Sequence, residues 1–181
     1  MEKTTDSAIK RIVLIGPEST GKTELTQFLS REFNTVYVPE YAREYIEKLN
    51  RKYSYNDVVH IAETQVGLSK KMINKANKVL FYDTYLIITK IWFKVVFNTY
   101  PSWIDKEMAE NPIDLFLLCN TDLEWVPDAV RENGGEMREK LFQMYMCEIE
   151  NYGFKYEIVK GVGEERYKNA LNIVNKFIKY K

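Results

Sequence analysis

The feature that most constrains the fold of this chain is a glycine-bracketed motif near its N-terminus. Four apolar residues at 12–15 run directly into Gly16-Pro17-Glu18-Ser19-Thr20-Gly21-Lys22-Thr23, which fits the pattern G-x-x-x-x-G-K-[ST] without a gap. A buried strand before this motif and a helix after it are typical of a phosphate-binding loop. Residues 22–33 meet the second condition, because their apolar side chains recur at the spacing of one helix face.

Each part of the motif has a chemical purpose. The glycines allow a tight turn that brings backbone N–H groups onto a phosphate, and the dipole of the following helix favours an anion there. Lys22 would place a positive charge near the β- and γ-phosphates, and the hydroxyl of Thr23 would reach a magnesium ion. The motif therefore predicts that all eight residues, Gly16 to Thr23, bind ATP with Mg²⁺ as the accompanying metal.

The remainder of the chain alternates between strand-like and helix-like segments. The patterns predict strands over residues 12–15, 35–38, 78–82, 113–119 and 155–159. Helices are expected over residues 22–33, 40–49, about 56–77, 84–100, 136–151 and 164–179, with a charged loop over 122–135. This alternation indicates an α/β protein of the P-loop, nucleoside-kinase-like class, with a five-stranded, mostly parallel sheet covered by helices on both faces. The length is that of one domain and no linker is visible, so residues 1–181 are expected to form a single domain.

Composition narrows the classes of partner. Lys+Arg and Asp+Glu both number 26, so the chain lacks the basic excess of a nucleic-acid binder, and none is expected as a partner. No apolar stretch approaches the roughly 20 residues that cross a bilayer, so no membrane insertion is expected. With two cysteines and no leader-like segment, a reducing cytoplasm is the expected location. A single histidine excludes most histidine-based metal sites and Ser-His-Asp triads. The expected partner of a nucleoside-kinase-like chain is a small-molecule nucleoside substrate.

Two carboxylates fall at the ends of predicted strands, where ligands bind in open α/β sheets. Asp83 directly follows the third strand and could hold magnesium, or could cap the next helix. Glu40 follows the second strand and could accept a proton from a substrate hydroxyl, or could stabilise a helix dipole. Arg43, one turn later, could face the same cleft or pair with Glu47 on the surface. Both Glu40 and Asp83 remain candidates for the general base.

A lid is expected after the fourth strand. Arg131 and Arg138 flank Gly134-Gly135, and arginines on such a flap could neutralise charge on a transferring γ-phosphoryl group, although both could instead belong to a solvated loop. Tyr41, Tyr85 and Trp125 are the aromatic residues expected nearest the cleft. Gln65 could contact a substrate edge or lie on the surface.

Taken in order, these motifs resemble the ribosylnicotinamide kinase domain of the NadR family. The resemblance rests on residues 16–23, Glu40-Tyr41-Ala42-Arg43-Glu44, Gln65, Phe81-Tyr82-Asp83-Thr84 and Trp125-Val126-Pro127-Asp128-Ala129-Val130-Arg131. It implies a stand-alone kinase domain, without the family's adenylyltransferase domain, that transfers the γ-phosphate of ATP to the 5′-hydroxyl of nicotinamide riboside in NAD salvage. In that scheme Lys22, Glu40, Asp83, Arg131 and Arg138 are catalytic. The substrate contacts Glu40, Tyr41, Arg43, Gln65, Tyr85, Trp125 and Asp128, and Thr23 and Asp83 hold the metal.

The resemblance is weaker around the nucleoside base than around the phosphates. The family pattern Asp-Thr-Asp is Asp83-Thr84-Tyr85 here, and the Asp-Gly before the lid arginine is Asp128-Ala129. Alternatives are therefore a kinase for another nucleoside or a nucleoside monophosphate, or an ATP-hydrolysing regulatory protein. Asn120-Thr121-Asp122 lacks the Asn-Lys-x-Asp pattern of a GTPase, and an AAA-type motor would need a second helical domain, for which the length leaves no room.

Overall fold

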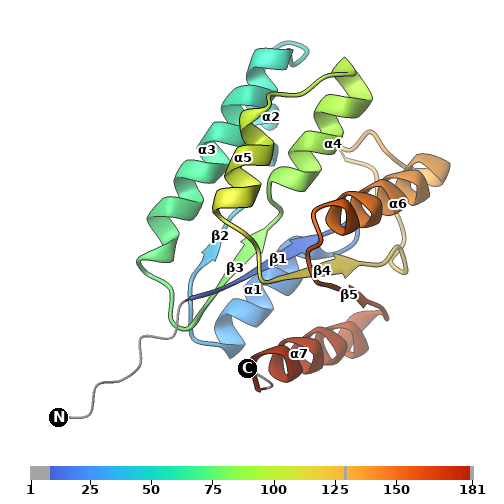
Figure 1. Ribbon diagram of the computed structural model, residues 1–181. Coiled ribbons are helices and arrows are strands. Elements are labelled where there is room, and N and C mark those ends of the chain that lie inside the picture. Colours follow the sequence, from blue (N-terminus) through green and yellow to red (C-terminus); the bar gives the residue numbers. More distant parts are fainter. Residues whose placement is uncertain (1–8, 129, 180–181) are drawn as a thin grey trace.

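A computed structural model describes residues 9–128 and 130–179, and its centre is one parallel sheet (Figure 1). The sheet has five strands in the order β2-β3-β1-β4-β5, and every neighbouring pair is parallel. The strands are β1 (Lys10–Ile15), β2 (Tyr37–Val38), β3 (Val79–Asp83), β4 (Leu115–Cys119) and β5 (Tyr156–Val159). The predicted α/β class with a five-stranded parallel sheet is therefore confirmed.

Helices cover both faces of the sheet. Helices α1 (Lys22–Glu32) and α7 (Gly163–Lys179) lie on one face. The opposite face carries α2 (Tyr41–Glu47), α3 (Tyr55–Ile73), α4 (Leu86–Phe97), α5 (Trp103–Glu110) and α6 (Gly135–Asn151). This division follows from the right-handed crossovers that parallel strands require.

The core has two layers because successive side chains of a strand point to opposite faces. Val13 and Ile15 of β1 pack in the layer under α3, α4 and α6, while Ile12 and Leu14 pack in the layer under α1 and α7. All four side chains are fully buried. Such a strand is apolar without alternation, which is why residues 12–15 read as a continuous hydrophobic run.

Helix α5 was not among the helices predicted from the sequence. It is fastened by Lys90 of α4, whose buried ammonium lies 2.7 Å from Asp105 of α5 and 2.5 Å from Glu148 of α6. The amine also donates to the hydroxyl of Tyr152, so this charge is fully paired despite its burial. A short helix held by such long-range contacts leaves little local signal in the sequence.

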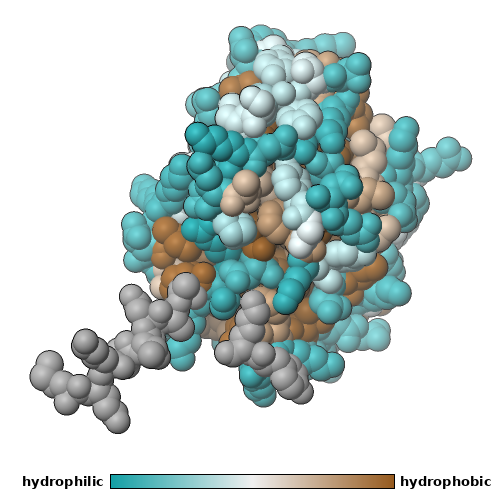
Figure 2. Space-filling model, in the orientation of Figure 1, coloured by the Kyte–Doolittle hydropathy of each residue, from teal (hydrophilic) through white to brown (hydrophobic). Residues whose placement is uncertain are grey.

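The face of the molecule drawn in Figure 2 is mainly polar. Hydrophilic residues predominate on this face and hydrophobic ones appear in small separate groups. Across the residues that the structure describes, none of the helices combines the length and apolar character needed to span a membrane.

Candidate active site

The phosphate-loop motif forms a tight turn between β1 and α1. A Cβ atom on Gly16 would lie 2.7 Å from the backbone oxygen of Cys119, at the end of the neighbouring strand β4, so only glycine fits there. Gly21 has a φ of 69° and Ser19 a φ of 57°, both in the left-handed region. The loop thus has the compact backbone shape that the motif predicts.

Two buried arginines hold the loop from behind. Arg138 of α6 donates from Nε to the carbonyl of Glu18 at 3.0 Å and from Nη2 to that of Ser19 at 2.9 Å. Arg166 of α7 donates from Nη2 to the carbonyl of Thr20 at 2.8 Å. Three successive carbonyls therefore point away from the space that a phosphate would fill.

This placement corrects the prediction for Arg138, which was expected to face the transferring phosphoryl group. Its side chain is buried, its N–H groups are taken up by loop carbonyls, and it does not line the cavity described below. Arg166 escaped the sequence reasoning altogether. It lies 146 residues from its partner Thr20 and belongs to no recognisable motif, so only the folded chain reveals its role.

Lys22, Thr23 and Asp83 meet at the start of α1. The ammonium of Lys22 donates to the carbonyl of Pro17 at 2.7 Å, and the hydroxyl of Thr23 donates to Oδ2 of Asp83 at 2.6 Å. The other oxygen of Asp83 is buried without a hydrogen-bond partner, and burial raises the pKa of this carboxyl. Helix α4 is capped at Tyr85, so the helix-cap alternative for Asp83 is wrong.

An unpaired carboxylate oxygen beside a threonine hydroxyl fits a magnesium ion, because Mg²⁺ prefers oxygen ligands and commonly takes one or two carboxylates together with substrate phosphates. No group of three His, Cys, Asp or Glu side chains within 9–128 and 130–179 forms a self-sufficient metal site. Thr23 and Asp83 supply two oxygen ligands, and substrate phosphates and water are the further ligands that Mg²⁺ commonly takes.

Glu40 stands at the N-terminus of α2, facing the cavity. Burial raises the pKa of its carboxyl to about 7, with Asp83 and Glu18 raising it further and Lys22 and Arg43 lowering it. The side chain of Glu40 makes no capping hydrogen bond to α2. A half-buried carboxyl whose pKa lies near neutrality is suited to accepting a proton.

Gln65 of α3 fixes the backbone on both sides of Glu40. Its amide oxygen accepts from the N–H of Tyr41 at 3.1 Å, and its amide nitrogen donates to the carbonyl of Pro39 at 3.0 Å. Only 3% of Gln65 is exposed, so the surface alternative is wrong. Nor does it line the cavity, which makes it a support for Glu40 rather than a contact for substrate.

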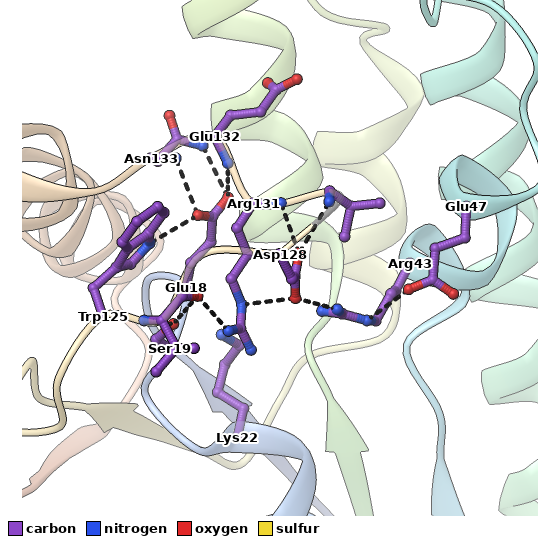
Figure 3. Close-up of polar contacts among 12 residues, drawn as sticks. Glu18, Ser19, Lys22, Arg43, Glu47, Trp125, Asp128, Arg131, Glu132 and Asn133 are labelled. Atoms are coloured by element: carbon purple, nitrogen blue, oxygen red, sulfur yellow. Dashed lines mark hydrogen bonds and ion pairs between the residues drawn. The ribbon is translucent and has the colours of Figure 1, made fainter.

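The lid segment, defined as Trp125–Asp128 together with Val130–Asn133, is bound to the phosphate loop (Figure 3). The carboxylate of Glu18 accepts from the backbone N–H of Glu132 at 3.1 Å and of Asn133 at 3.0 Å. The side chain of Asn133 donates to it at 3.1 Å and the indole of Trp125 at 3.3 Å.

Two arginines converge on Asp128. Arg131 donates from Nη1 to the carbonyl of Val126 at 2.6 Å, and its Nε lies 3.2 Å from Asp128. Asp128 also pairs with Arg43, whose Nε lies 3.0 Å from Glu47, and Arg43 holds the pKa of Asp128 down at about 2. Arg43 thus makes the predicted pair with Glu47 and also lines the cavity.

A cavity of about 540 Å³ joins these groups. Its polar end is formed by the phosphate loop with Glu40, Arg43 and Arg131. Its apolar end is lined by side chains of α2, α4, α6 and the segment before α3, namely Ile46, Tyr53, Ile88, Trp92, Leu141 and Tyr145. One continuous space therefore connects a phosphate-binding end to an aromatic end.

The aromatic residues at the cavity are not those expected from the sequence. Tyr85 is 3% exposed and packs against Tyr82 in the core, because Thr84, with a φ of 67°, turns the chain away from the cavity after Asp83. Tyr41 instead contacts His60 outside the cavity, and Trp125 binds Glu18. The cavity uses Tyr53, Trp92 and Tyr145. A signal for Trp92 existed, since Ile88, Trp92 and Val95 form a second apolar stripe on α4.

The parallel sheet, the loop after β1 and the acid at the end of the adjacent strand β3 define a P-loop protein with a kinase-like α/β fold. The chain belongs to the family described as an AAA domain, AAA_28, whose model matches residues 11–166. That match runs from β1 to the first residues of α7.

The chain is also homologous to NadR. It is 28% identical over 148 residues to the trifunctional NAD biosynthesis/regulator protein NadR of Salmonella typhimurium strain LT2, a match that covers 78% of this chain and 35% of the relative. The chain thus spans about a third of the length of this curated relative.

Solved structures of NadR also resemble this chain. A NadR structure in complex with NAD and AMP-PNP superimposes with a TM-score of 0.76 at 25% identity, covering 96% of this chain and 51% of that one. A NadR complex with NR gives 0.77 at 26% identity, covering 94% and 50%. The deoxyadenosine kinase of M. mycoides, at 16% identity and a TM-score of 0.66 over 92% and 99% of the two chains, shares the fold.

Proposed function

We propose that this protein transfers the γ-phosphate of ATP to the 5′-hydroxyl of nicotinamide riboside, giving nicotinamide mononucleotide. The observation that carries the proposal is the cavity of about 540 Å³ in which a phosphate loop, Glu40 and an aromatic end follow one another. Homology to NadR, which has been solved with AMP-PNP and with NR, supports both ligands.

The residues supply what phosphoryl transfer requires. Glu40 accepts the proton of the 5′-hydroxyl. The hydroxyl oxygen forms a bond to the γ-phosphorus while the bond between that phosphorus and the β,γ-bridging oxygen breaks, which releases ADP. Lys22 and Arg131 offset the negative charge on the transferring group. Arg138 and Arg166 act indirectly, by holding the loop that binds the phosphates.

Thr23 and Asp83 are the residues that would hold magnesium. When bound, the ion neutralises phosphate charge and orients the β- and γ-phosphates. Assigning Asp83 to the metal leaves Glu40 as the general base, because Asp83 is already hydrogen-bonded to Thr23 while Glu40 faces the cavity without a capping bond.

The charges around the cavity favour a nucleoside over a nucleoside monophosphate. Among its lining residues within the described ranges, the cations are Lys22, Arg43 and Arg131. Arg43 is already paired with Asp128 and Glu47, so none of the described lining cations is left unpaired at the aromatic end to bind an acceptor phosphate. An acceptor without a phosphate group fits this end best.

The same end suits a positively charged ring. Nicotinamide riboside carries a fixed positive charge on its pyridinium, and the faces of aromatic rings attract cations. Tyr53 and Trp92 pack edge to face with ring centroids 4.9 Å apart, and the hydroxyl of Tyr53 lies 3.5 Å from the Glu132 carboxylate. Aromatic faces beside carboxylates favour this cationic nucleoside over neutral ones.

The proposal is tested by incubating the purified protein with Mg-ATP and a panel of acceptors: nicotinamide riboside, adenosine, uridine and nicotinamide mononucleotide. We expect ADP release to depend on the acceptor, with kcat/KM for nicotinamide riboside at least about tenfold above the neutral nucleosides, given the size of cation–aromatic attraction. Equal ADP release with no acceptor would contradict the proposal and indicate a stand-alone ATPase.

Substitution of Trp92 tests the acceptor end. We expect Trp92→Leu to raise KM for nicotinamide riboside about tenfold, because a cation over an indole face contributes roughly 1–2 kcal/mol in a desolvated site. Trp92→Phe is the matched control, since it keeps an aromatic face and should change KM much less. Steady-state kinetics with each variant measure the difference, and equal KM values for the leucine and phenylalanine variants would exclude an aromatic contact.

A further inference from the structure

We infer that Glu18 is a positioning residue, which ties the phosphate loop to the lid segment and thereby holds Arg131 at the cavity. Its contribution to phosphoryl transfer rests on the proposed function, whereas the coupling of loop to lid segment does not. Glu18 occupies a position of the loop motif where any residue type satisfies the pattern, so the motif alone gives it no role.

The contacts of Glu18 are directed at one partner. Its carboxylate accepts four N–H groups, and all four belong to the lid segment: two from the backbone of Glu132 and Asn133, one from the side chain of Asn133 and one from the indole of Trp125. A carboxylate inside a phosphate-binding loop opposes a bound polyphosphate by like-charge repulsion. Four donors that converge on it stabilise its negative charge and at the same time fasten the lid segment.

The next loop residue strengthens this connection. The hydroxyl of Ser19 accepts from the backbone N–H of Val126 at 3.1 Å and lies 3.4 Å from the carbonyl of the same residue. Glu18 and Ser19 therefore bind the two ends of the lid segment, near Val126 and near Asn133. Their own carbonyls are held by Arg138, so the anchor itself is fixed.

Arg131 lies between these two attachment points. Its guanidinium donates to the carbonyl of Val126 at 2.6 Å and pairs with Asp128 at 3.2 Å, so its position depends on the backbone that Glu18 and Ser19 hold. Figure 3 shows Arg131 extending from the lid segment toward the phosphate loop, where Lys22 lies. Both side chains line the cavity, so losing the attachment would withdraw a positive charge from it.

Glu18→Gln tests the inference, because it keeps the size of the side chain but removes the charge and replaces one acceptor oxygen with a donor. We expect amide hydrogen exchange at Glu132 and Asn133 to accelerate at least tenfold. We also expect kcat to fall about tenfold, while the Kd for AMP-PNP, measured by calorimetry, changes less than threefold because loop amides bind the phosphates. Glu63→Gln, at an exposed site on α3, is the matched control and should change none of these.

Asn133→Ala provides a second route, since it removes one donor from the other side of the contact. If both substitutions break the same attachment, the amide exchange rate at Glu132 should agree within about twofold between Glu18→Gln and the double variant Glu18→Gln/Asn133→Ala. Unchanged exchange at Glu132 and Asn133 in Glu18→Gln would overturn the coupling. Faster exchange with an unchanged kcat would overturn the positioning role. A wild-type protein without acceptor-dependent turnover would overturn the proposed function, and the exchange measurements would still decide the coupling.

Discussion

Replacing Glu40 with glutamine is expected to lower kcat about 100-fold or more, which is the range lost when a general base is removed. The carboxyl is half-buried at the cavity, held by a backbone that Gln65 fixes, and surrounded by Lys22, Arg43, Asp83 and Glu18. Glutamine keeps the shape of the side chain but cannot accept the proton of a 5′-hydroxyl. The loss should therefore appear in kcat, with little change in the affinity for AMP-PNP.

The same substitution should stabilise the folded protein above neutral pH. The pKa of Glu40 is about 7 in the folded state against about 4.5 for an unperturbed carboxyl, so folding favours its protonated form. This favourable contribution is fully present below about pH 4.5 and is lost as the pH rises through about 7. Glutamine, which never ionises, avoids the loss. The full shift corresponds to about 3 kcal/mol, and about 2 kcal/mol of added stability is expected at pH 8 because solvent partly screens the half-buried carboxyl.

Thermal unfolding between pH 5 and pH 8 and kcat/KM over the same range check both effects. The unfolding midpoint of Glu40→Gln should exceed that of the wild type by about 5 °C at pH 8 and converge with it toward pH 5. Wild-type kcat/KM should rise with pH through about 7 as the base deprotonates. Glu44→Gln, at an exposed neighbouring position on α2, is the control, and a variant at position 40 that is fully active would exclude Glu40 as the base.

Lys22→Met is expected to lower kcat/KM for ATP about 1,000-fold, the upper range for losing one preorganised group that stabilises transition-state charge. The ammonium of Lys22 now bonds to the carbonyl of Pro17 at 2.7 Å, and this position at the start of α1 lets it turn to the β- and γ-phosphates. Methionine preserves the length of the side chain but removes its charge.

The fold should survive this change, because Lys22 lies at the cavity and not in either core layer. Circular dichroism and the unfolding midpoint should match those of the wild type, and Lys71→Met, at an exposed site on α3, should keep full activity. A Lys22→Met protein with near wild-type turnover would contradict the assignment of the loop as the triphosphate site.

The edge of the sheet that carries the site could be predicted from the sequence. Parallel strands bring their carboxyl ends to one edge of the sheet. The segments that follow the predicted strands 12–15, 35–38 and 78–82 must therefore lie together at that edge. The register confirms this geometry, since Leu14 pairs with Asp83 and Val38 pairs with Tyr82. The phosphate loop, Glu40 and Asp83 follow from this local pattern plus one rule of topology.

The groups that failed to follow from the sequence depend on contacts between distant helices. Trp92 and Tyr145 reach one cavity only because α4 and α6 pack side by side. Tyr85 was misplaced because the left-handed turn at Thr84 reverses the expected direction of the next side chain. The sequence placed Arg138 either at the phosphate or in a solvated loop, and its buried contacts with the carbonyls of Glu18 and Ser19 match neither expectation.

The bracing of the loop by Arg138 and Arg166 has a thermodynamic consequence for nucleotide binding. A flexible loop would lose about 1–2 kcal/mol of backbone entropy for each residue that a ligand immobilises. Here the carbonyls of Glu18, Ser19 and Thr20 are immobilised before any ligand arrives. The chain loses this backbone entropy when it folds, so a triphosphate binds to a loop that already has its bound shape.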